Sequence, residues 1–562
     1  MRPHGKGQLD SLYFHYPHFY AKPVAELNGA DATHPVAIVG AGPIGMTAAL
    51  ALARYGVRSV LLDNKSTFND GSRAICVARP SMHILDRIGA GKEFVAKALG
   101  WRHGRSYYRN KQIYRLEMPH SDQEKYLPMY NLQQQYIEQY LYNAVERCDL
   151  IDMRWQSEVT GLAQTPEGVT LNVASPLGDY AVSADYVLAA DGARSSVRSF
   201  MGLRLKGENY EGKYVIADVR MRHDFPTERR AFFDPAGNPG GTVLIHRQPD
   251  DIWRIDYQLR DGESEDEAIK EHNIRVRVQA ILDSIGHADG WELEWWSIYS
   301  ANTLCLDDYK HGRVIFVGDS AHIVPIFGVR GLNNGLADAY NAAWKLAYVV
   351  NGEAKPQLLD SYTPERRGAT LDVFDNATKS TRFMTPPTRG WKLAREAALS
   401  LALDHEFTRG FVNPRQMEAY RYSNSPLTVT GPDDPEFNQG PSSGSAAPNA
   451  RLNDGRFLLD FVGDGFAAIL FCDRSLTRTE IDMLAALRKL DRRFVALTVA
   501  MRGSSVAGAA VEDRDGTIAT IYGAGPGALY LLRPDLHIAA RWKVAAGAQV
   551  VAAMRTCLGD AS

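Results

Sequence analysis

Three short segments, far apart in the chain, carry residue types suited to binding the phosphates and hydroxyl groups of a dinucleotide. Residues 40–45 are Gly-Ala-Gly-Pro-Ile-Gly, residues 191–192 are Asp-Gly, and residues 318–319 are Gly-Asp. Glycine permits tight turns and a close approach of the backbone to phosphate, whereas a carboxylate accepts hydrogen bonds from hydroxyl groups. Because the segments supply complementary parts of such a site, together they predict one dinucleotide-binding site.

The glycine-rich segment lies between a predicted strand and a predicted helix. Residues 36–39 form an apolar run before it, and residues 46–54 after it have helix-forming composition. This context predicts that Gly40, Gly42 and Gly45 form a phosphate-binding turn. The helix N-terminus supplies free N–H groups and a favourable dipole for the pyrophosphate.

Acidic residues follow three further apolar runs: Asp63 follows residues 59–62, Asp191 and Gly192 follow residues 186–190, and Gly318 and Asp319 follow residues 313–317. Asp63 is 23 positions after Gly40, close to the spacing at which an acidic side chain meets the ribose hydroxyls of a dinucleotide. The other two pairs stand where a predicted strand ends, which is where α/β sheets place ligand contacts.

The third segment continues into a longer stretch that resembles a known family. Residues 318–325 are Gly-Asp-Ser-Ala-His-Ile-Val-Pro, and the similarity extends through Phe327 and residues 328–335 to residues 338–346. The chain resembles the single-component FAD-dependent aromatic hydroxylases of the phenol hydroxylase and 3-(3-hydroxyphenyl)propionate hydroxylase type, over nearly its whole length from Pro35. The resemblance implies an α/β fold, with a Rossmann-like FAD-binding domain, an inserted sheet-rich substrate domain and a thioredoxin-like C-terminal domain.

The resemblance also implies roles for individual residues at the cofactor. Asp319 matches the residue that contacts the ribityl chain of FAD, and Arg73 matches an arginine near the flavin and pyrophosphate. Gln134, at the start of a predicted helix, matches a glutamine that contacts the cofactor, although Gln133 and Gln135 leave the register open.

A predicted helix N-terminus at residues 331–333 suits the negative charge of reduced flavin. The backbone amides of Gly331, Leu332 and Asn333 can stabilise that charge without a formal cation. Residues 328–330 are Gly-Val-Arg, where members of the family often carry Gly-Gly-Gln. This departure leaves the substrate contacts near the flavin open, but the backbone role is compatible with it.

Candidate catalytic residues lie in the predicted substrate sheet. His246 and Tyr257 have the chemistry to activate or orient a phenol, and Arg254 or Arg247 to meet a carboxylate. An ordinary strand position is the alternative for each of them. We expect His322 to hold its loop rather than to act in catalysis.

Composition restricts the class of protein. The 562 residues suggest roughly three domains. A net charge of −3 gives no electrostatic case for nucleic acid or an acidic membrane surface. The five cysteines show no paired spacing, so we expect neither disulfides nor a metal site, and a reducing cytoplasm fits best. No apolar run reaches membrane-spanning length, and a signal peptide is not predicted.

The pattern of predicted elements divides the chain into six parts: an aromatic-rich extension at 1–34, the FAD-binding domain at 35–209, a substrate-binding sheet at 210–305, the return to the FAD-binding domain with helices at 306–425, a linker at 426–450 and the C-terminal domain at 451–562. The linker is expected to be flexible because it is rich in Pro, Gly, Ser and Asn. The extension is expected to pack on the body or on another subunit.

The resemblance implies a monooxygenase that hydroxylates a phenolic or related aromatic substrate. NADH or NADPH, docking transiently, reduces bound FAD, and reaction with O2 gives a flavin C4a-hydroperoxide that transfers oxygen to the ring. Two alternatives remain: oxidation or epoxidation of a non-phenolic or polycyclic metabolite, and a flavin-binding sensor with little turnover. The substrate, the preferred nicotinamide and the formation of a homo-oligomer are left open by the sequence.

Overall fold

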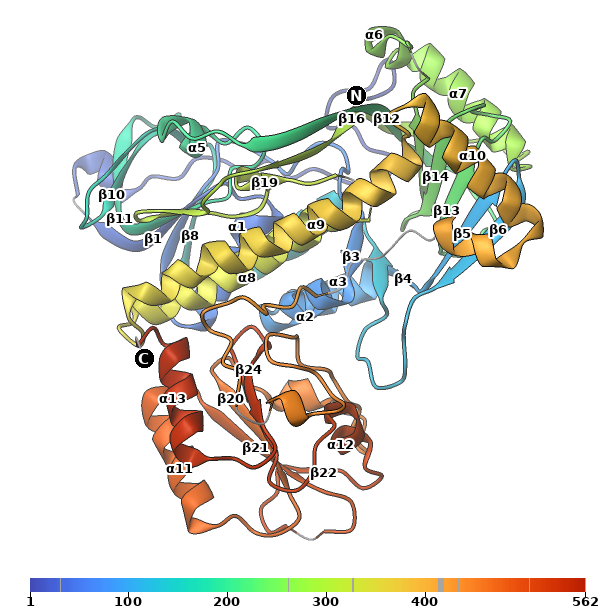
Figure 1. Ribbon diagram of the computed structural model, residues 1–562. Helices are drawn as coiled ribbons and strands as arrows, with labels where there is room; N and C mark the ends of the chain where they lie inside the picture. The colour runs from blue at the N-terminus through green and yellow to red at the C-terminus, as the bar shows by residue number, and fades with distance from the viewer. Residues whose placement is uncertain are drawn as a thin grey trace.

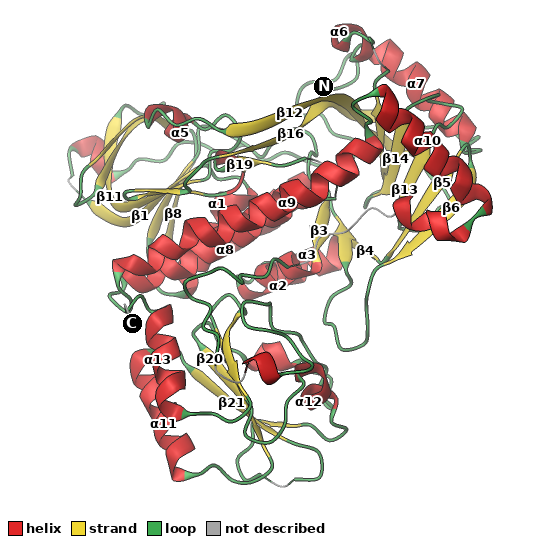
Figure 2. Ribbon diagram, viewed as in Figure 1, coloured by secondary structure: helices red, strands yellow, loops and turns green. Residues whose placement is uncertain are grey.

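The computed structural model describes residues 1–30, 32–260, 262–325, 328–412, 419–431, 434–504 and 506–560. These residues form three large sheets and one small sheet, with helices between and around them (Figures 1 and 2). The α/β fold class predicted from the sequence is confirmed. Phe327, from the stretch that carries the family resemblance, lies outside the described residues.

The first sheet gathers the predicted dinucleotide segments at one edge. Its strand order is β17-β18-β11-β1-β2-β8, with β10 and β9 antiparallel beside β11. β1 pairs in parallel with β2 and β11, and β11 pairs in parallel with β18, so the carboxyl ends of these strands face the same way. The strands are β1 (Thr33–Val39), β2 (Ser59–Leu62), β8 (Ile151–Arg154), β9 (Glu158–Gln164), β10 (Val169–Ala174), β11 (Tyr180–Ala189), β17 (Lys310–His311) and β18 (Val314–Phe316).

Helices cover this sheet. They fix the position of the carboxyl ends of its parallel strands, which we call the ligand edge. α1 (Pro43–Arg54) is buried from Met46 to Leu52 and packs between the sheet, α4 (Gln134–Glu146) and α8 (Arg330–Val350). A helix buried on nearly all sides needs small apolar residues, which the alanines of α1 supply. α9 (Tyr362–Met384) runs beside α8 (Figure 1), and α5 (Ser196–Phe200) follows the β11 segment.

The second sheet has the strand order β19-β16-β12-β15-β14-β13-β5-β6. It takes three strands from outside the predicted substrate domain: β5 pairs in parallel with β13, β6 extends the sheet beyond β5, and β19 pairs antiparallel with β16. Between β15 and β16 the chain forms two helices, α6 (Glu265–Ala268) and α7 (Glu271–Ser284). The strands are β5 (His103–Tyr108), β6 (Lys111–Glu117), β12 (Lys206–Arg220), β13 (Arg229–Phe233), β14 (Thr242–Arg247), β15 (Ile252–Gln258), β16 (Glu292–Cys305) and β19 (His322–Ile323).

The remaining elements before the C-terminal sheet are a small three-stranded sheet, three α-helices and several 3-10 helices. The sheet has the order β3-β7-β4. The elements are β3 (Cys76–Ala78), β4 (Leu99–Trp101), β7 (Met129–Asn131), α2 (Arg79–Arg87), α3 (Gly91–Lys97), α10 (Arg389–Asp404), and the 3-10 helices η1 (Ala25–Asn28), η2 (Gly318–Ser320), η3 (Pro356–Ser361), η4 (Glu406–Val412), η5 (Asp434–Glu436) and η6 (Leu458–Phe461).

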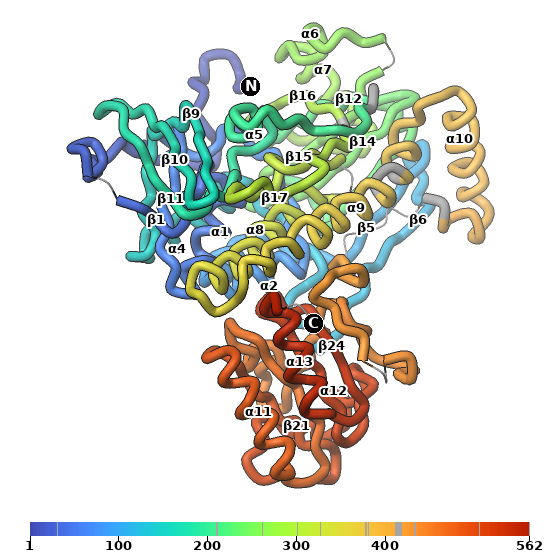
Figure 3. The backbone as a smooth tube through the Cα atoms, turned by 60° about the vertical axis from the view of Figure 1, so that its left-hand side comes forward, coloured from blue at the N-terminus to red at the C-terminus, as the bar shows by residue number. Residues whose placement is uncertain are grey.

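The C-terminal sheet has the order β22-β21-β20-β23-β24, and it lies against α2 and α8 in both views (Figures 1 and 3). β20, β21 and β22 are parallel, whereas β23 and β24 form an antiparallel hairpin. The elements are β20 (Ala467–Cys472), β21 (Val495–Ala500), β22 (Val511–Glu512), β23 (Leu529–Leu532), β24 (Ile538–Trp542), α11 (Arg478–Leu490), α12 (Thr517–Tyr522) and α13 (Gly547–Cys557).

The described part of the predicted linker is held against the C-terminal sheet rather than free. The N–H of Val429 donates to the carbonyl of Ala539 at 2.8 Å, and the N–H of Gly444 donates to the carbonyl of Ile538 at 2.7 Å. Leu427 and Ala450 are buried. The prediction of a flexible segment is therefore wrong for these residues, because composition does not reveal that β24 offers an edge for hydrogen bonding.

The N-terminal extension packs on the body through its aromatic residues. Phe19 stacks on Trp155 with ring centroids 4.4 Å apart, and Phe14 is buried. Arg2 forms ion pairs with Asp70, in the loop between β2 and β3, and with Glu294 on β16, so the extension is joined to that loop and to the second sheet.

Within the described residues, no helix is long and apolar enough to cross a membrane, and no group of His, Cys, Asp or Glu side chains could hold a metal ion. All five cysteines are free thiols.

Candidate functional site

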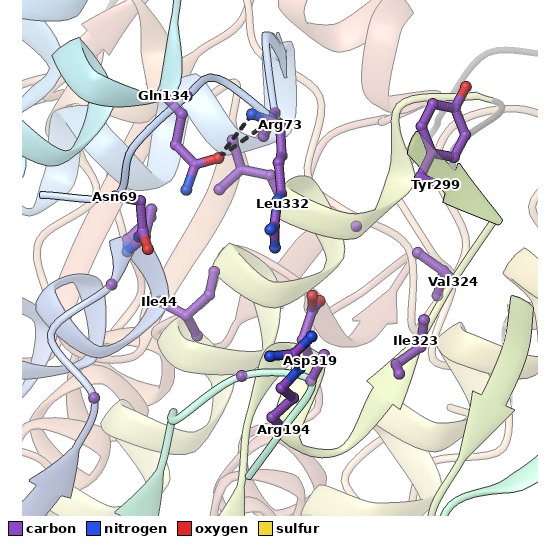
Figure 4. A pocket seen from close by; sticks show the side chains of 18 of the residues that line it. Ile44, Asn69, Arg73, Gln134, Arg194, Tyr299, Asp319, Ile323, Val324 and Leu332 are labelled. Atoms are coloured by element: carbon purple, nitrogen blue, oxygen red, sulfur yellow. Dashed lines mark hydrogen bonds between the residues drawn. The ribbon is translucent and has the colours of Figure 1, made fainter. Parts of the chain in front are cut away.

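A cavity of about 1120 Å³ extends from the ligand edge of the first sheet to one face of the second sheet (Figure 4). This exceeds the roughly 300–1,000 Å³ of a typical small-molecule site, so the cavity has room for more than one ligand. Ten of the predicted cofactor residues line it: Gly40, Gly42, Asp63, Arg73, Gln134, Asp191, Gly192, Asp319, Gly331 and Leu332.

The glycine loop has the geometry of a phosphate cradle. Gly40 has a φ of +102°, and a Cβ on it would lie 2.5 Å from the carbonyl oxygen of Ala190. A Cβ on Gly45 would lie 1.8 Å from the carbonyl oxygen of Gly40. By contrast, nothing lies within 4 Å of a Cβ on Gly42, the N-cap of α1, and no side chain caps this helix. Two glycines thus permit the turn, and the third leaves room for a ligand at free N–H groups.

Asp63 and Asp191 follow β2 and β11, the two strands that flank β1 in the first sheet. Asp63 is buried, and its carboxylate accepts hydrogen bonds from the N–H of Ala41 at 2.7 Å and of Lys65 at 2.9 Å. Asp191 accepts a bond from the N–H of Val197 through Oδ2 at 3.0 Å, whereas its Oδ1 is buried without a partner. An unsatisfied buried acceptor is costly, so the Asp191 carboxylate fits a ligand hydroxyl that donates to it.

Asp319 projects into the cavity from η2 (Figure 4). Its preceding residue, Gly318, has a φ of +63° and donates its N–H to Asp338 at 3.1 Å. Asp319 is accessible from the cavity, but protein surrounds it closely and this burial raises its pKa. His322 binds Asp338 through Nε2 at 2.6 Å and does not line the cavity, which is the loop-holding position expected for it.

Of the three consecutive glutamines that the sequence left open, Gln134 is the one that lines the cavity. Its Oε1 accepts hydrogen bonds from the N–H groups of Arg73 and Ala74, both at 3.2 Å (Figure 4). Gln133 and Gln135 instead bind the carbonyl of Pro249 and the hydroxyl of Tyr16 and do not line the cavity. Gln134 therefore fixes the segment that carries Arg73 at the cavity wall.

The N-terminus of α8 also reaches the cavity. Its N-cap, Val329, has a φ of +57° and offers no side-chain cap, so the amides of Gly331 and Leu332 remain available at the cavity. The structure corrects the prediction for Asn333, which does not line the cavity. Its Oδ1 accepts the N–H of Ala78, and its Nδ2 donates to the carbonyl of Cys76. It lies one residue too far along the helix to have a free amide.

On the second sheet, alternation along β15 separates the candidate residues. Arg254 and Asp256 face the cavity, so Tyr257 faces the other side of the sheet. There it packs in the core with α7, and the Cζ atom of Arg277 lies 5.5 Å from the centroid of its ring. The prediction of a catalytic role for Tyr257 is therefore wrong. Arg247 also lies outside the cavity lining.

Arg254 lines the cavity, but its guanidinium is already bound. It forms an ion pair with Asp218 at 2.9 Å and donates to the carbonyl of Arg73 at 3.0 Å and to that of Ser72. Arg254 thus holds the loop that carries Arg73, and it is not free to meet a substrate carboxylate as predicted.

His246 faces the cavity from β14 and is buried, with no hydrogen-bond partner for Nδ1 among the described residues. Burial, and then the charges of Arg229 and Arg254, lower its pKa well below the usual value. The imidazole is therefore neutral at physiological pH, able to orient a polar group but not to supply a cation.

Three titratable residues of the second sheet line the cavity without having been predicted from the sequence: Arg229, Asp256 and Tyr299. Asp256 is two residues from Arg254 on the same strand, so the period-two pattern could have identified it. Arg229 lies on β13, a strand that is not predicted from the sequence, and no sequence pattern marks this arginine.

Comparison with protein families agrees with this geometry. The model described as FAD binding domain matches residues 33–377, and the HcaD C-terminal domain model matches residues 447–557. The chain belongs to the FAD-dependent aromatic hydroxylases. A 3-(3-hydroxy-phenyl)propionate/3-hydroxycinnamic acid hydroxylase of Klebsiella pneumoniae (strain 342) is 26% identical over 523 residues, covering 90% of this chain and 92% of the relative.

Two solved structures share the fold of this hydroxylase. The flavin-dependent monooxygenase PieE, in complex with FAD and substrate, has a TM-score of 0.75 at 23% identity, covering 94% of this chain and 100% of that one. Aklavinone-11 hydroxylase, in a ternary complex with FAD and aklavinone, has a TM-score of 0.76 at 21% identity with the same coverage.

FAD is the cofactor of this hydroxylase, and the residues at the ligand edge fit it. The space beside Gly42 and the unsatisfied Oδ1 of Asp191 are what a dinucleotide with phosphates and hydroxyl groups requires. The remaining cavity lies against the second sheet, where the ring to be hydroxylated has room.

Proposed function

We propose that the chain hydroxylates a phenolic or related aromatic compound, with NADH or NADPH as the electron donor and O2 as the oxygen source. The observation that carries this proposal is that one continuous cavity reaches from the dinucleotide loop to the polar face of the second sheet. The name of the Klebsiella relative, a hydroxylase of a phenolic acid, supports it.

The cofactor-binding residues have separate tasks in this proposal. The glycine loop of residues 40–45 holds the pyrophosphate, Asp63 and Asp191 accept hydroxyl groups, and Asp319 accepts from the ribityl chain. The N-terminus of α8 stabilises negative charge on the flavin. Bound FAD, reduced by NAD(P)H, supplies an activated oxygen atom from O2; the protein excludes water and places the ring.

Asp256 is the residue that we assign as proton acceptor for the phenol. It faces the cavity, its Oδ1 is buried without a partner, and burial raises its pKa to about 7. Arg254 and Arg229 oppose that rise, whereas Asp218 adds to it. His246 and Tyr299 complete the surroundings. A carboxylate with this pKa accepts a proton near neutral pH, and the resulting phenolate is the better nucleophile toward electrophilic oxygen.

We expect turnover to rise with pH around the pKa of about 7 of Asp256, because only the ionised carboxylate accepts a proton. Asp256→Asn should lower kcat near pH 7 by about 10²-fold or more, with activity returning only as the phenol itself ionises. Asp251→Asn, an exposed change in the same hairpin, is the control. An unchanged pH profile in Asp256→Asn would remove Asp256 from the mechanism.

The same carboxyl group gives a measurement that is independent of turnover. Its folded pKa of about 7 lies above the unfolded value of about 3.9, so the folded state binds more protons between these values. The free energy of unfolding should therefore fall as pH rises from about 4 to about 7, and Asp256→Asn should remove that contribution. Chemical denaturation across this range measures it.

The decisive test of the function uses purified protein and a panel of phenols and aromatic acids. We expect yellow protein with non-covalent FAD, reductant consumption that a phenolic compound accelerates, and a product with one oxygen atom from labelled O2. Incorporation of oxygen from water would contradict the reaction. Reductant consumption that never depends on an aromatic compound would favour a flavin-binding sensor.

The cavity volume of about 1120 Å³ favours a second candidate, the oxidation or epoxidation of a non-phenolic or polycyclic metabolite. Both candidates use the same FAD site, since function resides in the substrate pocket. Including polycyclic compounds in the panel separates the two candidates. If the second candidate is right, a polycyclic compound stimulates reductant consumption and a monocyclic phenol does not.

We also propose that residues 451–562 form a thioredoxin-like domain with a supporting role. A β20-α11-β21 unit followed by the β23-β24 hairpin and α13 supports this assignment. Its two cysteines, Cys472 and Cys557, are buried and have no Cys-x-x-Cys spacing, so dithiol chemistry is not part of the proposal.

A further inference from the structure

Arg229 is a buried cation without a partner in the cavity wall. It is only 7% exposed, it lines the cavity, and its guanidinium forms no ion pair or hydrogen bond with any residue that the structure describes. Burial lowers its pKa, but arginine stays protonated in proteins. An unpaired buried charge is costly, which marks this guanidinium as a site that a ligand can satisfy.

Other arginines of the second sheet have carboxylate partners, so the lack of a partner is particular to Arg229. Arg254 is paired with Asp218, and Arg230 and Arg105 both pair with Glu228. Arg230 follows Arg229 on β13 and therefore points to the other face. Of these four arginines, only Arg229 faces the cavity and lacks a carboxylate.

The groups around Arg229 do not neutralise it. Directly opposite on β14 lies His246, which is neutral and has an unpartnered Nδ1. Asp256 also faces the cavity but forms no ion pair with Arg229, and near neutral pH it is partly protonated. Leu244 and Ile216 add apolar wall beside them. Arg229 therefore places an unpaired cation on the part of the cavity wall that the second sheet forms, and one carboxylate would balance it.

We propose that Arg229 binds the carboxylate of an aromatic acid and makes this site select anionic substrates over neutral phenols. This inference rests on the proposed function, from which it takes the aromatic ring in the same cavity. Arg229 forms charge-assisted hydrogen bonds to the carboxylate, while His246 offers a further polar contact and the apolar wall receives the chain between carboxylate and ring. A neutral alcohol would leave the buried guanidinium without its counter-charge.

Binding without turnover tests the inference. FAD-loaded protein, with no reductant, is titrated by calorimetry with 3-(3-hydroxyphenyl)propanoate and with the corresponding neutral alcohol, 3-(3-hydroxyphenyl)propan-1-ol. We expect the acid to bind at least roughly 10-fold more tightly than the alcohol, as for a hydrogen bond to a charged group. Arg229→Met should weaken acid binding by roughly 10- to 100-fold and leave alcohol binding unchanged, and Arg229→Lys should restore part of the preference.

Arg230→Met is the matched control, because it removes the adjacent arginine on the opposite face of the sheet. Glu228, which pairs with Arg230, would still have its ion pair with Arg105. It should keep the preference for the acid. The inference is overturned if the wild-type protein binds acid and alcohol equally or binds neither, or if Arg229→Met keeps the preference. Loss of FAD in both Arg229 variants would assign Arg229 to the cofactor instead. Acid-selective binding without any hydroxylation would sink the proposed function while leaving the carboxylate site standing.

Discussion

Gly42→Ala is expected to fold as the wild-type protein does and to lose its affinity for FAD. Gly42 has a φ of −72°, which alanine adopts readily, and nothing lies within 4 Å of the added Cβ. The methyl group would occupy the space that we assign to the pyrophosphate at the N-terminus of α1. We therefore expect FAD affinity to fall by about 10²-fold or more, a loss of two or more hydrogen bonds to a charged group at about 1.5–3 kcal/mol each.

Gly45→Ala is expected to behave differently, because its Cβ would lie 1.8 Å from the carbonyl oxygen of Gly40. The loop and α1 must shift, so both stability and FAD affinity should fall. Gly290→Ala, whose Cβ meets nothing within 4 Å in an exposed loop, is the control. FAD affinity by flavin fluorescence and thermal unfolding of the apoprotein separate the two effects. A Gly42→Ala protein that retains FAD at wild-type affinity would show that the pyrophosphate lies elsewhere.

The cofactor edge could be predicted from the sequence because its constraints are local. A glycine loop after an apolar run, and an aspartate at each strand end, specify a parallel sheet with a ligand at its carboxyl edge. The structure brings Gly40, Asp63, Asp191 and Asp319 to that edge. The register of Gln134 needed tertiary information, because three consecutive glutamines are equivalent in the sequence.

The substrate face could not be predicted to the same degree, because side-chain direction in a strand depends on which face is covered. Tyr257 and Arg254 are both plausible ligands by residue type, yet one lies under α7 and the other is paired with Asp218. A shift of one residue in a strand exchanges the two faces. Arg229 required knowledge of β13 and of what its neighbours pair with, which is a property of the sheet and not of the segment.

Four buried charges join the C-terminal domain to the FAD-binding domain. Arg533, beside β23, binds both carboxylate oxygens of Glu365 on α9 at 2.6 and 2.9 Å and also pairs with Asp535 at 2.6 Å. Lys345 on α8 donates to Glu365 at 2.7 Å. Burial raises the pKa of Glu365, but Arg533 and Lys345 outweigh it and bring that pKa to about 2. The network is ionised at neutral pH, so removing one member leaves charges buried without compensation.

Arg533→Met is expected to destabilise the protein by about 3–5 kcal/mol, because Glu365 and Asp535 lose their shared cation in the interior. Arg533→Lys should cost less, since it keeps the charge but not the two-point contact. Arg456→Met is the control: Arg456 is exposed and its pair with Asp454 is worth about 0–1 kcal/mol. Calorimetric unfolding of the FAD-loaded protein measures the differences. An Arg533→Met protein as stable as Arg456→Met would show that the network contributes nothing to holding the domain.

Truncation after Ser425 extends this test to the whole C-terminal domain. It removes Arg533 and Asp535 from Glu365 and Lys345, and it uncovers Trp344 on α8, whose ring lies 6.1 Å from that of Phe466. If the domain has a supporting role, the truncated chain should lose solubility or thermal stability, and its soluble fraction should keep FAD and substrate-stimulated NAD(P)H oxidation in proportion to folded protein. A truncated protein that is stable and binds FAD normally, but no longer responds to substrate, would place the domain in the reaction cycle. The cavity offers a reason to expect the first result, because every described residue that lines it precedes residue 333.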